Sequence, residues 1–443
     1  MKKVITYGTY DLLHYGHVNL LKRAKELGDY LIVGVTADDF DKRRGKINVQ
    51  QPLMERIEAI KGTGIADQII VEEYEGQKID DIKKYGIDIF AIGSDWLGKF
   101  DYLKDLCSVV YLERTMGVSS SEIRSKNGAV KLGLVGDSSF LNKVKQESAF
   151  VNGINVDALC TNKLDLMSRE LQDVKFVTSE YDAFLNHVDA VYVRSVPELH
   201  YEQCKKALLS GKHVLCESPL TLESKQSQEL FDLAISNELV LMEAIKTAYS
   251  TAFLRLVLLI KGGKIGKVVS VDATCTSLRK IAEERITDWR GIYEWGPTGL
   301  LPVFMILGTE YKNVNMVASF HDKDQKDDSF TKIDFIYDNA VASIKVGNGV
   351  KSEGELIVSG TQGYIYVPAP WWKTDYFEVR YENATDNKRY FYQLEGEGIR
   401  YELVAFARAI ENKCSMSNID SKVSFKISEV MGDFIRQNNM TII

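Results

Sequence analysis

The feature that most constrains the fold of this 443-residue chain is an alternation of strand-like and helix-like segments through its first half. Apolar runs such as residues 29–36 (DYLIVGVT) and 189–194 (DAVYVR) lack the polar alternation of a strand with one solvated face. They predict strands that are buried on both faces of a parallel sheet, and segments with helical spacing stand between most of them. The first half is therefore predicted to be α/β.

Interruptions of this alternation divide the chain into three predicted domains. Residues 1–128 form a first α/β series, which ends at the short turn-forming segment 125–128 (SKNG). A second series over residues 129–250 predicts a doubly wound sheet of the dinucleotide-binding kind. Over residues 251–443, strand-like runs separated by turns and followed by two helices predict an α+β domain with a large, mostly antiparallel sheet.

Composition and charge narrow the functional classes. The chain has 55 Lys and Arg against 62 Asp and Glu and no long basic block, so we expect no nucleic-acid partner. No run approaches the roughly 18 apolar residues of a membrane span, and the first residues lack the features of a signal peptide. Six cysteines without a CxxC pair indicate reduced thiols and disfavour a structural zinc site. We expect a cytoplasmic homo-oligomer, either a dimer or a tetramer.

His14 and His17 stand in the segment that joins the first predicted strand to the first helix (GTYDLLHYGH). The carboxyl end of a strand beside a helix N-terminus is the usual anion site of a parallel sheet. Residues three apart lie on the same side of a helical turn, and Gly16 between them lets the backbone approach a ligand. Two imidazoles there suit a phosphate chain, with two histidines on an ordinary turn as the alternative interpretation.

A second anion-binding pattern follows a late strand of the same predicted domain, in residues 114–122 (RTMGVSSSE). Arg114 offers a planar and permanently charged fork for phosphate. Ser119 and Glu122 have the spacing of a capping box, which predicts a helix start whose free N–H groups and serine hydroxyls cradle an anion. A plain helix cap is the alternative interpretation of Ser119.

With both motifs, residues 1–125 resemble the glycerol-3-phosphate cytidylyltransferase family of HxGH nucleotidyltransferases, in a Rossmann-like domain. The resemblance implies in-line attack of a polyol phosphate on the α-phosphorus of CTP, with Mg²⁺ on the triphosphate and release of pyrophosphate. It implies no metal ligand among the side chains. The residues that it places at the site of CTP are His14, His17, Arg114, Thr115, Ser119 and Ser120, with Thr9, Tyr10, Asp11, Asp67 and Asp95 around them.

Two departures from this family concern the acceptor. Residues 44–51 (RGKINVQQ) contain a one-residue insertion, and Arg44 stands where the family usually has lysine. Arg44, Lys46 and Arg56 are the candidates for the acceptor phosphate, and a solvated surface charge is the alternative for each of them. Glycerol 3-phosphate is the first choice of acceptor, while glycerol 2-phosphate and longer polyol phosphates stay open.

From residue 129 onward the chain resembles the glucose–fructose oxidoreductase/inositol dehydrogenase (Gfo/Idh/MocA) family. Most of the resemblance lies in residues 188–222 (VDAVYVRSVPELHYEQCKKALLSGKHVLCESPLTL), with additions at 264–267 (KIGK) and 360–363 (GTQG). The resemblance implies a domain that uses NAD or NADP to oxidise or reduce a polyol or a sugar.

The cofactor motif departs from G-x-G-x-x-G, because Ser138 and Leu141 stand where the second and third glycines are expected after Gly136. The next predicted strand ends without an acidic ribose ligand, and Lys163 there favours NADP because it could meet a 2′-phosphate. A surface lysine is the alternative interpretation. The candidate cofactor-binding residues are Gly136, Ser138, Ser139, Thr161, Lys163 and Glu217.

The usual catalytic lysine and histidine of this family are both absent. Ser218 replaces the lysine of the Glu-Lys-Pro motif, and residues 295–302 (WGPTGLLP) contain no histidine. Lys246 and Tyr249, after the last strand of the doubly wound sheet, are the best replacement proton donors, with a solvated helix lysine as the alternative for Lys246. Two hypotheses follow for this part of the chain: a reductase that converts a keto-phosphate into the polyol phosphate, or a non-catalytic binding or dimerisation module.

Overall fold

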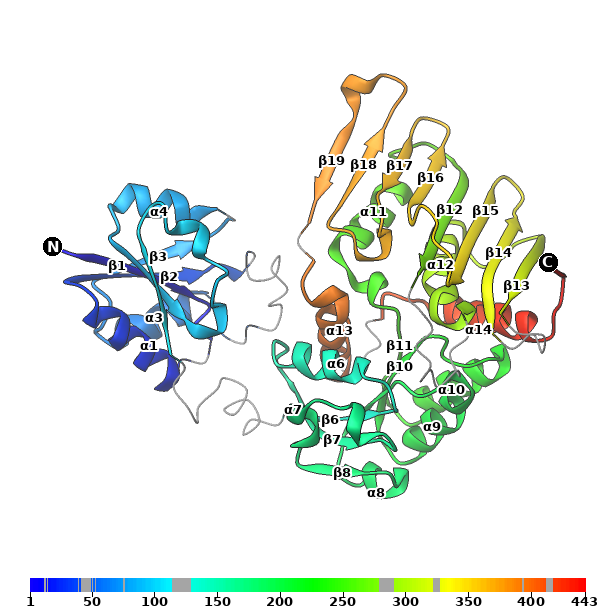
Figure 1. The fold of residues 1–443 in the computed structure, drawn as a ribbon, viewed down its shortest axis with the longest axis horizontal. Coiled ribbons are helices and arrows are strands. Elements are labelled where there is room, and N and C mark those ends of the chain that lie inside the picture. Colours follow the sequence, from blue (N-terminus) through cyan, green and yellow to red (C-terminus); the bar gives the residue numbers. More distant parts are fainter. Residues whose placement is uncertain are drawn as a thin grey trace. The chain divides into compact units, whose positions relative to one another are not determined.

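The computed structural model describes residues 1–443 except 12, 14, 39, 41–48, 50, 52, 75, 114–128, 279–290, 322–326, 393 and 412–416. The described residues form two compact units, Met1–Ala129 with Ala149–Gly153, and Val130–Ser148 with Ile154–Ile443. Both units are drawn in Figure 1. The predicted boundary near residue 250 falls inside the second unit and stays a prediction.

The first unit contains a parallel sheet whose described strands have the order β3-β2-β1-β4-β5. The strands are β1 (Lys3–Gly8), β2 (Tyr30–Thr36), β3 (Gln68–Glu72), β4 (Ile89–Gly93) and β5 (Ser108–Leu112). The helices between them are α1 (Tyr15–Glu26), α3 (Leu53–Gly62) and α4 (Gln77–Tyr85), with the short 3₁₀ helices η1 (Ser94–Trp96) and η2 (Asp101–Leu103) after β4. The predicted parallel α/β architecture is confirmed for this unit.

Both faces of this sheet are buried, as its uninterrupted apolar runs predict. Val4 of β1 packs on one face with Leu21 of α1, whereas the next residue, Ile5, packs on the other face with Ile82 of α4. Successive side chains of a strand point to opposite faces, so each strand needs apolar residues at consecutive positions.

β1 lies between β2 and β4, so the chain changes direction across the sheet at this strand. Val4 pairs with Leu31 of β2 on one side and with Ile89 of β4 on the other. In parallel sheets, the connections leave two neighbouring strands in opposite directions at the point where the strand order reverses. Such a point has a crevice at the carboxyl ends of the two strands, and ligands bind there.

The second unit begins with a parallel sheet in which the described strands follow the order β11-β10-β9-β6-β7-β8. Its strands are β6 (Val130–Val135), β7 (Ile154–Cys160), β8 (Phe176–Thr178), β9 (Ala190–Val193), β10 (His213–Glu217) and β11 (Leu241–Ala244). The intervening helices are α6 (Phe140–Ser148), η3 (Leu164–Leu166), α7 (Arg169–Gln172), α8 (Tyr181–Leu185), α9 (Pro197–Leu209) and α10 (Ser224–Ser236). The direction switch falls between β6 and β9.

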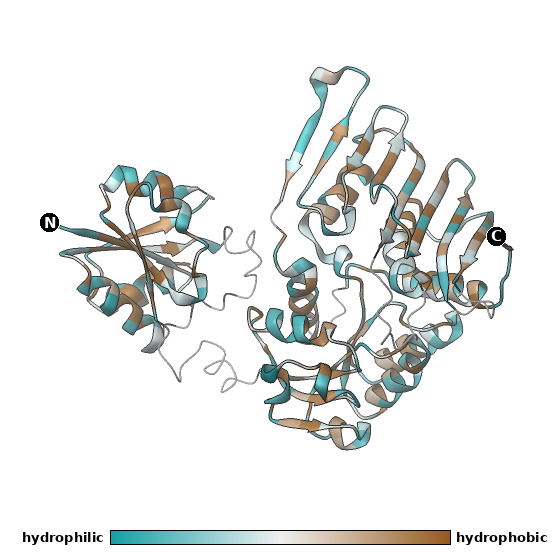
Figure 2. Cartoon of the chain, in the orientation of Figure 1, coloured by the Kyte–Doolittle hydropathy of each residue, from teal (hydrophilic) through white to brown (hydrophobic). Residues whose placement is uncertain are grey.

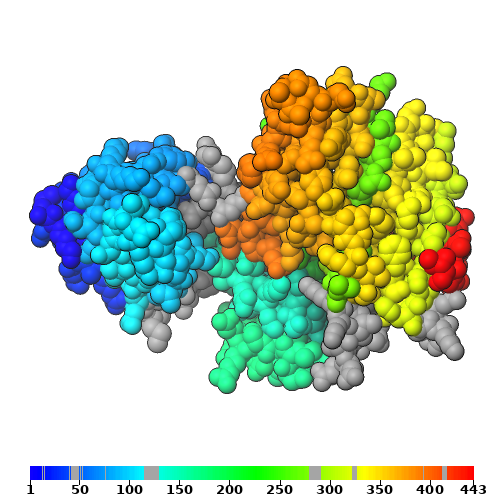
Figure 3. All heavy atoms as spheres, turned by 45° about the horizontal axis from the view of Figure 1, so that its top comes forward, coloured from blue at the N-terminus to red at the C-terminus, as the bar shows by residue number. Residues whose placement is uncertain are grey.

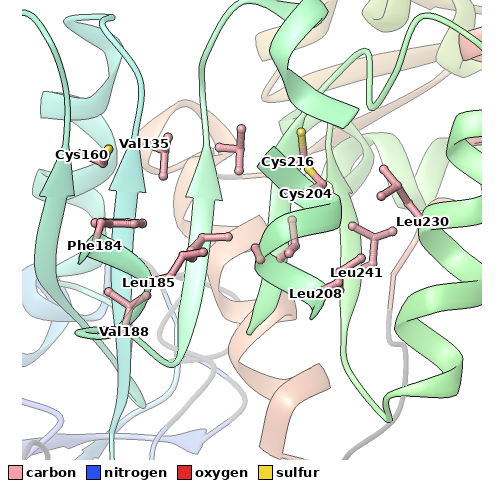
Figure 4. Close-up of a cluster of buried hydrophobic side chains, with 14 of the residues drawn as sticks. Val135, Cys160, Phe184, Leu185, Val188, Cys204, Leu208, Cys216, Leu230 and Leu241 are labelled. Atoms are coloured by element: carbon pink, nitrogen blue, oxygen red, sulfur yellow. The ribbon is translucent and has the colours of Figure 1, made fainter. Parts of the chain in front are cut away.

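A buried cluster on one face holds this sheet to its helices (Figure 4). Phe184 of α8 lies against the strands, and the thiols of Cys204 and Cys216 lie inside the same cluster. Burial raises the pKa of the Cys216 thiol, so this group behaves as a small apolar side chain.

The rest of the second unit is built on a mixed sheet with the described order β19-β18-β17-β16-β12-β15-β14-β13-β20. The strand bounds are β12 (Val268–Ser277), β13 (Asn313–Phe320), β14 (Asp328–Ile336), β15 (Val341–Asn348), β16 (Leu356–Gly360), β17 (Tyr364–Val367), β18 (Tyr376–Arg380), β19 (Lys388–Phe391) and β20 (Met440–Ile442). Only the β12–β15 and β13–β20 pairs among these described strands are parallel, which confirms the predicted, mostly antiparallel sheet.

The helices of this part of the unit are η4 (Lys246–Tyr249), α11 (Thr251–Lys261), α12 (Gly291–Leu307), η5 (Trp371–Lys373), η6 (Ala384–Asp386), η7 (Gly396–Gly398), α13 (Ile399–Glu411) and α14 (Ser421–Ile435). Helices α11 and α12 pack against the large sheet, whereas α13 packs against α6 and α14 against α10 and α12 (Figure 1). Polar and apolar residues alternate in the first half of β13, from Asn313 to Met316, and the residue hydropathies are drawn in Figure 2. The strands from β16 to β19 form a continuous outer surface of the unit (Figure 3).

None of the helices in the described part of the chain combines the length and the apolar composition that crossing a bilayer requires.

Candidate active sites

The loop after β1 fixes His17 at the carboxyl edge of the first sheet. Tyr10 has a φ of 54° and is buried, and a Cβ atom on Gly8 would lie only 2.9 Å from its ring. The Tyr10 ring meets the His17 imidazole edge to face, with ring centroids 5.5 Å apart. Burial raises the pKa of the Tyr10 phenol, so the ring is a neutral support. His17 lies in the first turn of α1, where the free backbone N–H groups of the helix favour a bound anion.

Arg56 joins three loops at this edge and is completely buried. Its Nη1 donates to the carbonyl oxygens of Thr9 (2.6 Å) and Thr36 (2.9 Å), and its Nε donates to that of Gln51 (3.0 Å). Its Nη2 pairs with Asp38. A guanidinium with these partners organises the loops after β1 and β2 and the entry to α3, whereas a contact with the acceptor phosphate stays a prediction.

Two predicted carboxylates also lie at the carboxyl edge. Asp11 is buried and accepts a hydrogen bond from the backbone N–H of Gln51 at 2.9 Å. Asp95 is exposed in η1, directly after β4. Since β1 and β4 are neighbours, the fold brings Thr9, Tyr10, Asp11, His17 and Asp95 to the carboxyl ends of these two strands.

Asp67 lies at the opposite edge, which corrects its predicted place around CTP. It precedes β3, accepts a hydrogen bond from the backbone N–H of Leu31 at the start of β2 (2.6 Å), and pairs with Lys25. In a parallel sheet the residue before a strand lies at the amino edge, and the seven residues of β2 separate the two edges by about 20 Å. Asp67 therefore stabilises the far end of the sheet.

The other predicted residues of the first site are outside the described residues, and their roles stay predictions. They are His14, Arg44, Lys46, Arg114, Thr115, Ser119 and Ser120. Within the described ranges, no group of three His, Cys, Asp or Glu side chains could hold a metal ion. Mg²⁺ that arrives on a triphosphate needs few protein ligands.

The second crevice follows β6 and β9. Gly136 has a φ of 134°, and a Cβ atom there would collide with the carbonyl of Arg194 after β9, so glycine is required. Ser138 Oγ accepts a hydrogen bond from the Phe140 N–H (3.3 Å) at the start of α6, while Leu141 is completely buried in the core. A glycine turn that leads into a helix N-terminus fits the pyrophosphate of a dinucleotide.

Asp137 is a residue of this crevice that the sequence motifs do not single out. Its Oδ1 accepts hydrogen bonds from Thr161 Oγ1 (2.8 Å) and from the Asn162 N–H (2.7 Å). The carboxylate therefore lies at the carboxyl end of β7, where an acidic group binds ribose hydroxyls in dinucleotide folds. A carboxylate there repels a 2′-phosphate, which opposes the preference for NADP inferred from Lys163. Asp137, which follows Gly136 in the turn, therefore provides a carboxylate at the end of β7, where the sequence of that strand has none.

Ser218, which replaces the usual catalytic lysine, and Tyr249, a predicted proton donor, both form hydrogen bonds within the protein. Ser218 Oγ donates to Glu243, whose Oε1 also accepts from the Leu220 N–H at 3.0 Å. Tyr249 is buried, and its hydroxyl lies 3.3 Å from the Glu243 carbonyl. Neither Ser218 nor Tyr249 therefore presents a proton to the crevice, and Tyr249 is no longer a candidate donor.

Two acidic side chains, the half-buried Glu217 and the buried Glu402, lie beside these residues. The Tyr192 hydroxyl donates to Glu217 and lies 3.5 Å from Glu402 Oε1. Burial, and then the charge of Glu217, raises the pKa of Glu402 well above its usual range. The predicted contact of Glu217 with a cofactor stays a prediction.

Lys246 is at the carboxyl edge, after β11. Its Nζ lies 5.2 Å from the centroid of the Phe140 ring and 3.6 Å from Glu397 Oε2. Burial lowers the pKa of Lys246, whereas the neighbouring Glu217 and Glu397 act in the opposite direction. A cation at this position could donate a proton to a substrate in the crevice, and that role stays a prediction.

Comparison with known proteins divides the chain in the same way. Residues 5–126 match the cytidylyltransferase-like family model, and residues 137–245 match the model of an oxidoreductase family with an NAD-binding Rossmann fold. Glycerol-3-phosphate cytidylyltransferase of Staphylococcus aureus is 48% identical over 130 residues, which are 28% of this chain and 95% of that protein. The enzyme of the same name from Bacillus subtilis is 48% identical over 126 residues, which are 28% of this chain and 97% of that protein.

Solved structures resemble the second unit. KijD10, a 3-ketoreductase from Actinomadura kijaniata in complex with NADP and TDP-benzene, has a TM-score of 0.61 and 20% identity over 71% of this chain and 99% of its own. Levoglucosan dehydrogenase has a TM-score of 0.60 and 17% identity over 70% and 97%. At this identity the likeness shows the fold alone.

The two family models and the glycerol-3-phosphate cytidylyltransferases identify the chain. It belongs to the cytidylyltransferase-like family, as a nucleotidyltransferase of the glycerol-3-phosphate cytidylyltransferase type, and carries a Gfo/Idh/MocA oxidoreductase domain in the residues that follow.

Proposed function

We propose that the first unit joins CTP to a polyol phosphate, with glycerol 3-phosphate as the first choice, and releases pyrophosphate. The observation that carries this proposal is the placement of His17 in the first turn of α1, at the switch point between β1 and β4. A phosphate oxygen of the acceptor attacks the α-phosphorus of CTP, and the bond to the pyrophosphate oxygen breaks in line. The product is a CDP-polyol such as CDP-glycerol.

The residues at the carboxyl edge stabilise the charge that develops in this transfer. His17 donates a hydrogen bond to a phosphate oxygen while phosphorus is pentacoordinate, and the N-terminus of α1 adds its partial positive charge. Arg56 acts indirectly, since it holds the Thr9 carbonyl and the entry to α3 in place. When bound, Mg²⁺ neutralises charge on the triphosphate. We infer that the reaction takes place in the cytoplasm and supplies an activated polyol for a cell-surface polymer.

For the second unit we propose the reduction of a keto-phosphate to the polyol phosphate that the first unit consumes. Gly136 and the N-terminus of α6 would hold a dinucleotide pyrophosphate, and Asp137 would accept hydrogen bonds from its ribose. The bound cofactor supplies a hydride to the carbonyl carbon. Lys246 would deliver the proton to the carbonyl oxygen, because it is the ammonium group beside Phe140 at this edge.

A non-catalytic binding or dimerisation module is the second candidate for this unit. Its support is the bonding of Ser218 to Glu243, which leaves the position of the usual catalytic lysine without a proton donor to the crevice.

The test of the first proposal is pyrophosphate release from the full chain with CTP, Mg²⁺ and a panel of polyol phosphates. We expect release with glycerol 3-phosphate and much slower release when ATP replaces CTP. No release with any member of the panel would contradict the transferase. Titration of the same protein with NADH and NADPH, followed by cofactor fluorescence, separates the reductase from the binding module, since the module predicts no binding of either.

A further inference from the structure

Three lysines from three separate elements of the second unit converge on one carboxylate. Lys143 of α6, Lys246 of η4 and Lys373 of η5 place their Nζ atoms 3.1, 3.6 and 2.8 Å from oxygens of Glu397 in η7. We call these three lysines the lysine cradle. They come from positions up to 230 residues apart, and their convergence is a property of the tertiary structure (Lys143 to Lys373).

The lysine cradle borders the second crevice. Lys246 follows β11 at the carboxyl edge of the parallel sheet, and Lys143 is in the first turns of α6, the helix that begins after the Gly136 turn. The ring of Phe140 connects the two sides, since the Lys246 Nζ lies 5.2 Å from its centroid. A ligand held by the cradle would therefore lie beside the proposed cofactor site.

The three ammonium groups of the cradle contact a single carboxylate, that of Glu397. Glu217 is a second carboxylate, and it attracts Lys246. Glu402 is a further carboxyl group near Lys246, and burial raises its pKa well above the usual range. Arg400 pairs with Glu147 (3.0 Å) and with Glu395 (3.8 Å).

Glu397 is presented by an unusual backbone. Gly396, Glu397 and Gly398 have φ values of 56°, 55° and 93°, a left-handed conformation that a glutamate rarely adopts. Gly396 packs so closely on Glu147 that a Cβ atom would collide with its carboxylate, and a Cβ atom on Gly398 would lie 3.1 Å from the Lys246 carbonyl oxygen. The segment is thus fixed in a conformation that brings one partly exposed carboxylate to the cradle.

We propose that the lysine cradle binds the phosphate group of the phosphorylated substrate, and that Glu397 occupies this site when the phosphate is absent. A phosphate monoester carries nearly two negative charges and three strong acceptor oxygens, against one charge and two oxygens for Glu397. Ammonium groups are point charges that rotate freely, so the same three lysines can serve either anion. The inference that the ligand is a keto-phosphate rests on the proposed reduction, whereas the inference that the cradle binds phosphate does not.

The two ends of the cradle would then have different tasks. Lys143 and Lys373, which approach Glu397 most closely, hold the phosphate. Lys246 is the furthest of the three from Glu397, and its Nζ lies over the ring of Phe140, so release from Glu397 leaves its ammonium group free to face the carbonyl of a keto-phosphate. The site would therefore select small carbonyl compounds that carry a phosphate.

The test measures binding by calorimetry to the full chain, with dihydroxyacetone phosphate and inorganic phosphate as probes and dihydroxyacetone as the uncharged control. The double variant Lys143→Ala/Lys373→Ala should weaken binding of dihydroxyacetone phosphate about tenfold or more, since it removes two charged hydrogen bonds. Glu397→Gln should strengthen binding severalfold, because it removes the competing charge and keeps the shape. Lys206→Ala is the matched control: Lys206 is as exposed as Lys143 and pairs with Asp182 elsewhere in the second unit.

The outcomes separate this inference from the proposed reduction. If Glu397→Gln and the double variant lower the unfolding temperature but leave both phosphate affinities unchanged, the cluster is a structural ion network and the inference is wrong. Binding that follows the expected order, with no oxidation of NADH or NADPH, supports the phosphate site and removes the reductase. Should the double variant fail to fold, the affinity of Glu397→Gln decides alone.

Discussion

The carboxylate of Asp137 accepts a hydrogen bond from the hydroxyl of Thr161 at 2.8 Å, and so joins the glycine turn after β6 to the end of β7. This bond places an acid where the strand sequence has none. We therefore expect Asp137 as well as Lys163 to affect any preference of the second unit between NAD and NADP.

We expect the second unit to bind NADH more tightly than NADPH. Asp137→Asn keeps an acceptor for Thr161 but removes the charge, so it should shift the affinity ratio about tenfold toward NADPH. Fluorescence titration with each cofactor measures the ratio. Lys163→Ala is the companion variant, since it should weaken NADPH alone if Lys163 meets the 2′-phosphate. A wild-type protein that prefers NADPH, with Asp137→Asn unchanged, would show that Asp137 is merely structural.

His17→Ala should lower the rate of pyrophosphate release from CTP about 10²-fold or more, because it removes a donor that acts on the transition state. Its folding should be nearly unaffected, since the imidazole is only half-buried and meets Tyr10 through a ring edge. The rate is measured at saturating CTP and acceptor, with thermal unfolding of the same samples as the control. A variant that unfolds like the wild type and turns over at a similar rate rules out this role.

Arg56→Ala should destabilise the first unit by roughly 2–4 kcal/mol, because it leaves carbonyl oxygens that the buried guanidinium serves without a donor, at a cost of about 1–3 kcal/mol for each that stays unpaired. Arg56→Lys should recover only part of this, because one ammonium group cannot reach the carbonyls of Thr9, Thr36 and Gln51 together. Denaturant unfolding gives the stability, and separate KM values for CTP and the acceptor distinguish the alternatives. A rise in the acceptor KM with unchanged stability would instead make Arg56 a direct ligand of the acceptor phosphate.

Asp67→Asn should change kcat/KM for CTP by less than about threefold, because Asp67 lies across the sheet from His17. Asp95→Asn, at the carboxyl edge, is the comparison variant and should lower kcat/KM more strongly. Initial rates at varied CTP suffice for both. A larger loss in Asp67→Asn than in Asp95→Asn, at equal stability, would return Asp67 to the nucleotide site.

Binding of dihydroxyacetone phosphate to the lysine cradle should weaken as the pH falls from 7.5 to 5, by about tenfold if only the phosphate dianion binds. Although burial acts to raise it, the hydrogen bonds from Lys373 and Lys143 lower the pKa of Glu397 to about 2, so this competitor stays ionised throughout the range. The contribution of Glu397 to stability is accordingly present above its unfolded pKa and is lost only as the pH falls toward 2. Calorimetry at several pH values checks the sign, since tighter binding at pH 5 would mean that Glu397 is released by protonation.

The amino-acid sequence determines the two parallel sheets of this protein, because strands buried on both faces need consecutive apolar residues and such runs are local. The run at 29–36 becomes β2 (Tyr30–Thr36), and the run at 189–194 becomes β9 (Ala190–Val193). The placement of His17 is equally local, since only a short segment separates the end of β1 at Gly8 from the start of α1 at Tyr15.

Helices and strands that are stabilised by contacts with residues far away in the sequence cannot be predicted from their own amino-acid patterns. Helix α12 contains Pro297 and Pro302, which disfavour a helix by themselves, yet most of its residues are buried against the large sheet and α14. Strand β3 is only half-buried along most of its length and lacks a strong apolar run. Their neighbours in the fold, and not their own propensities, make these segments regular.

The tertiary structure alone decides which charged groups meet. Strand direction moves Asp67 to the amino edge, although its residue type suits a nucleotide site. A turn brings the Asp137 carboxylate to the end of β7, and chain crossovers bring Lys143 to Glu397 across 254 residues of sequence. The energies of such contacts depend on distance in space and on burial, and neither quantity is written in the order of the residues.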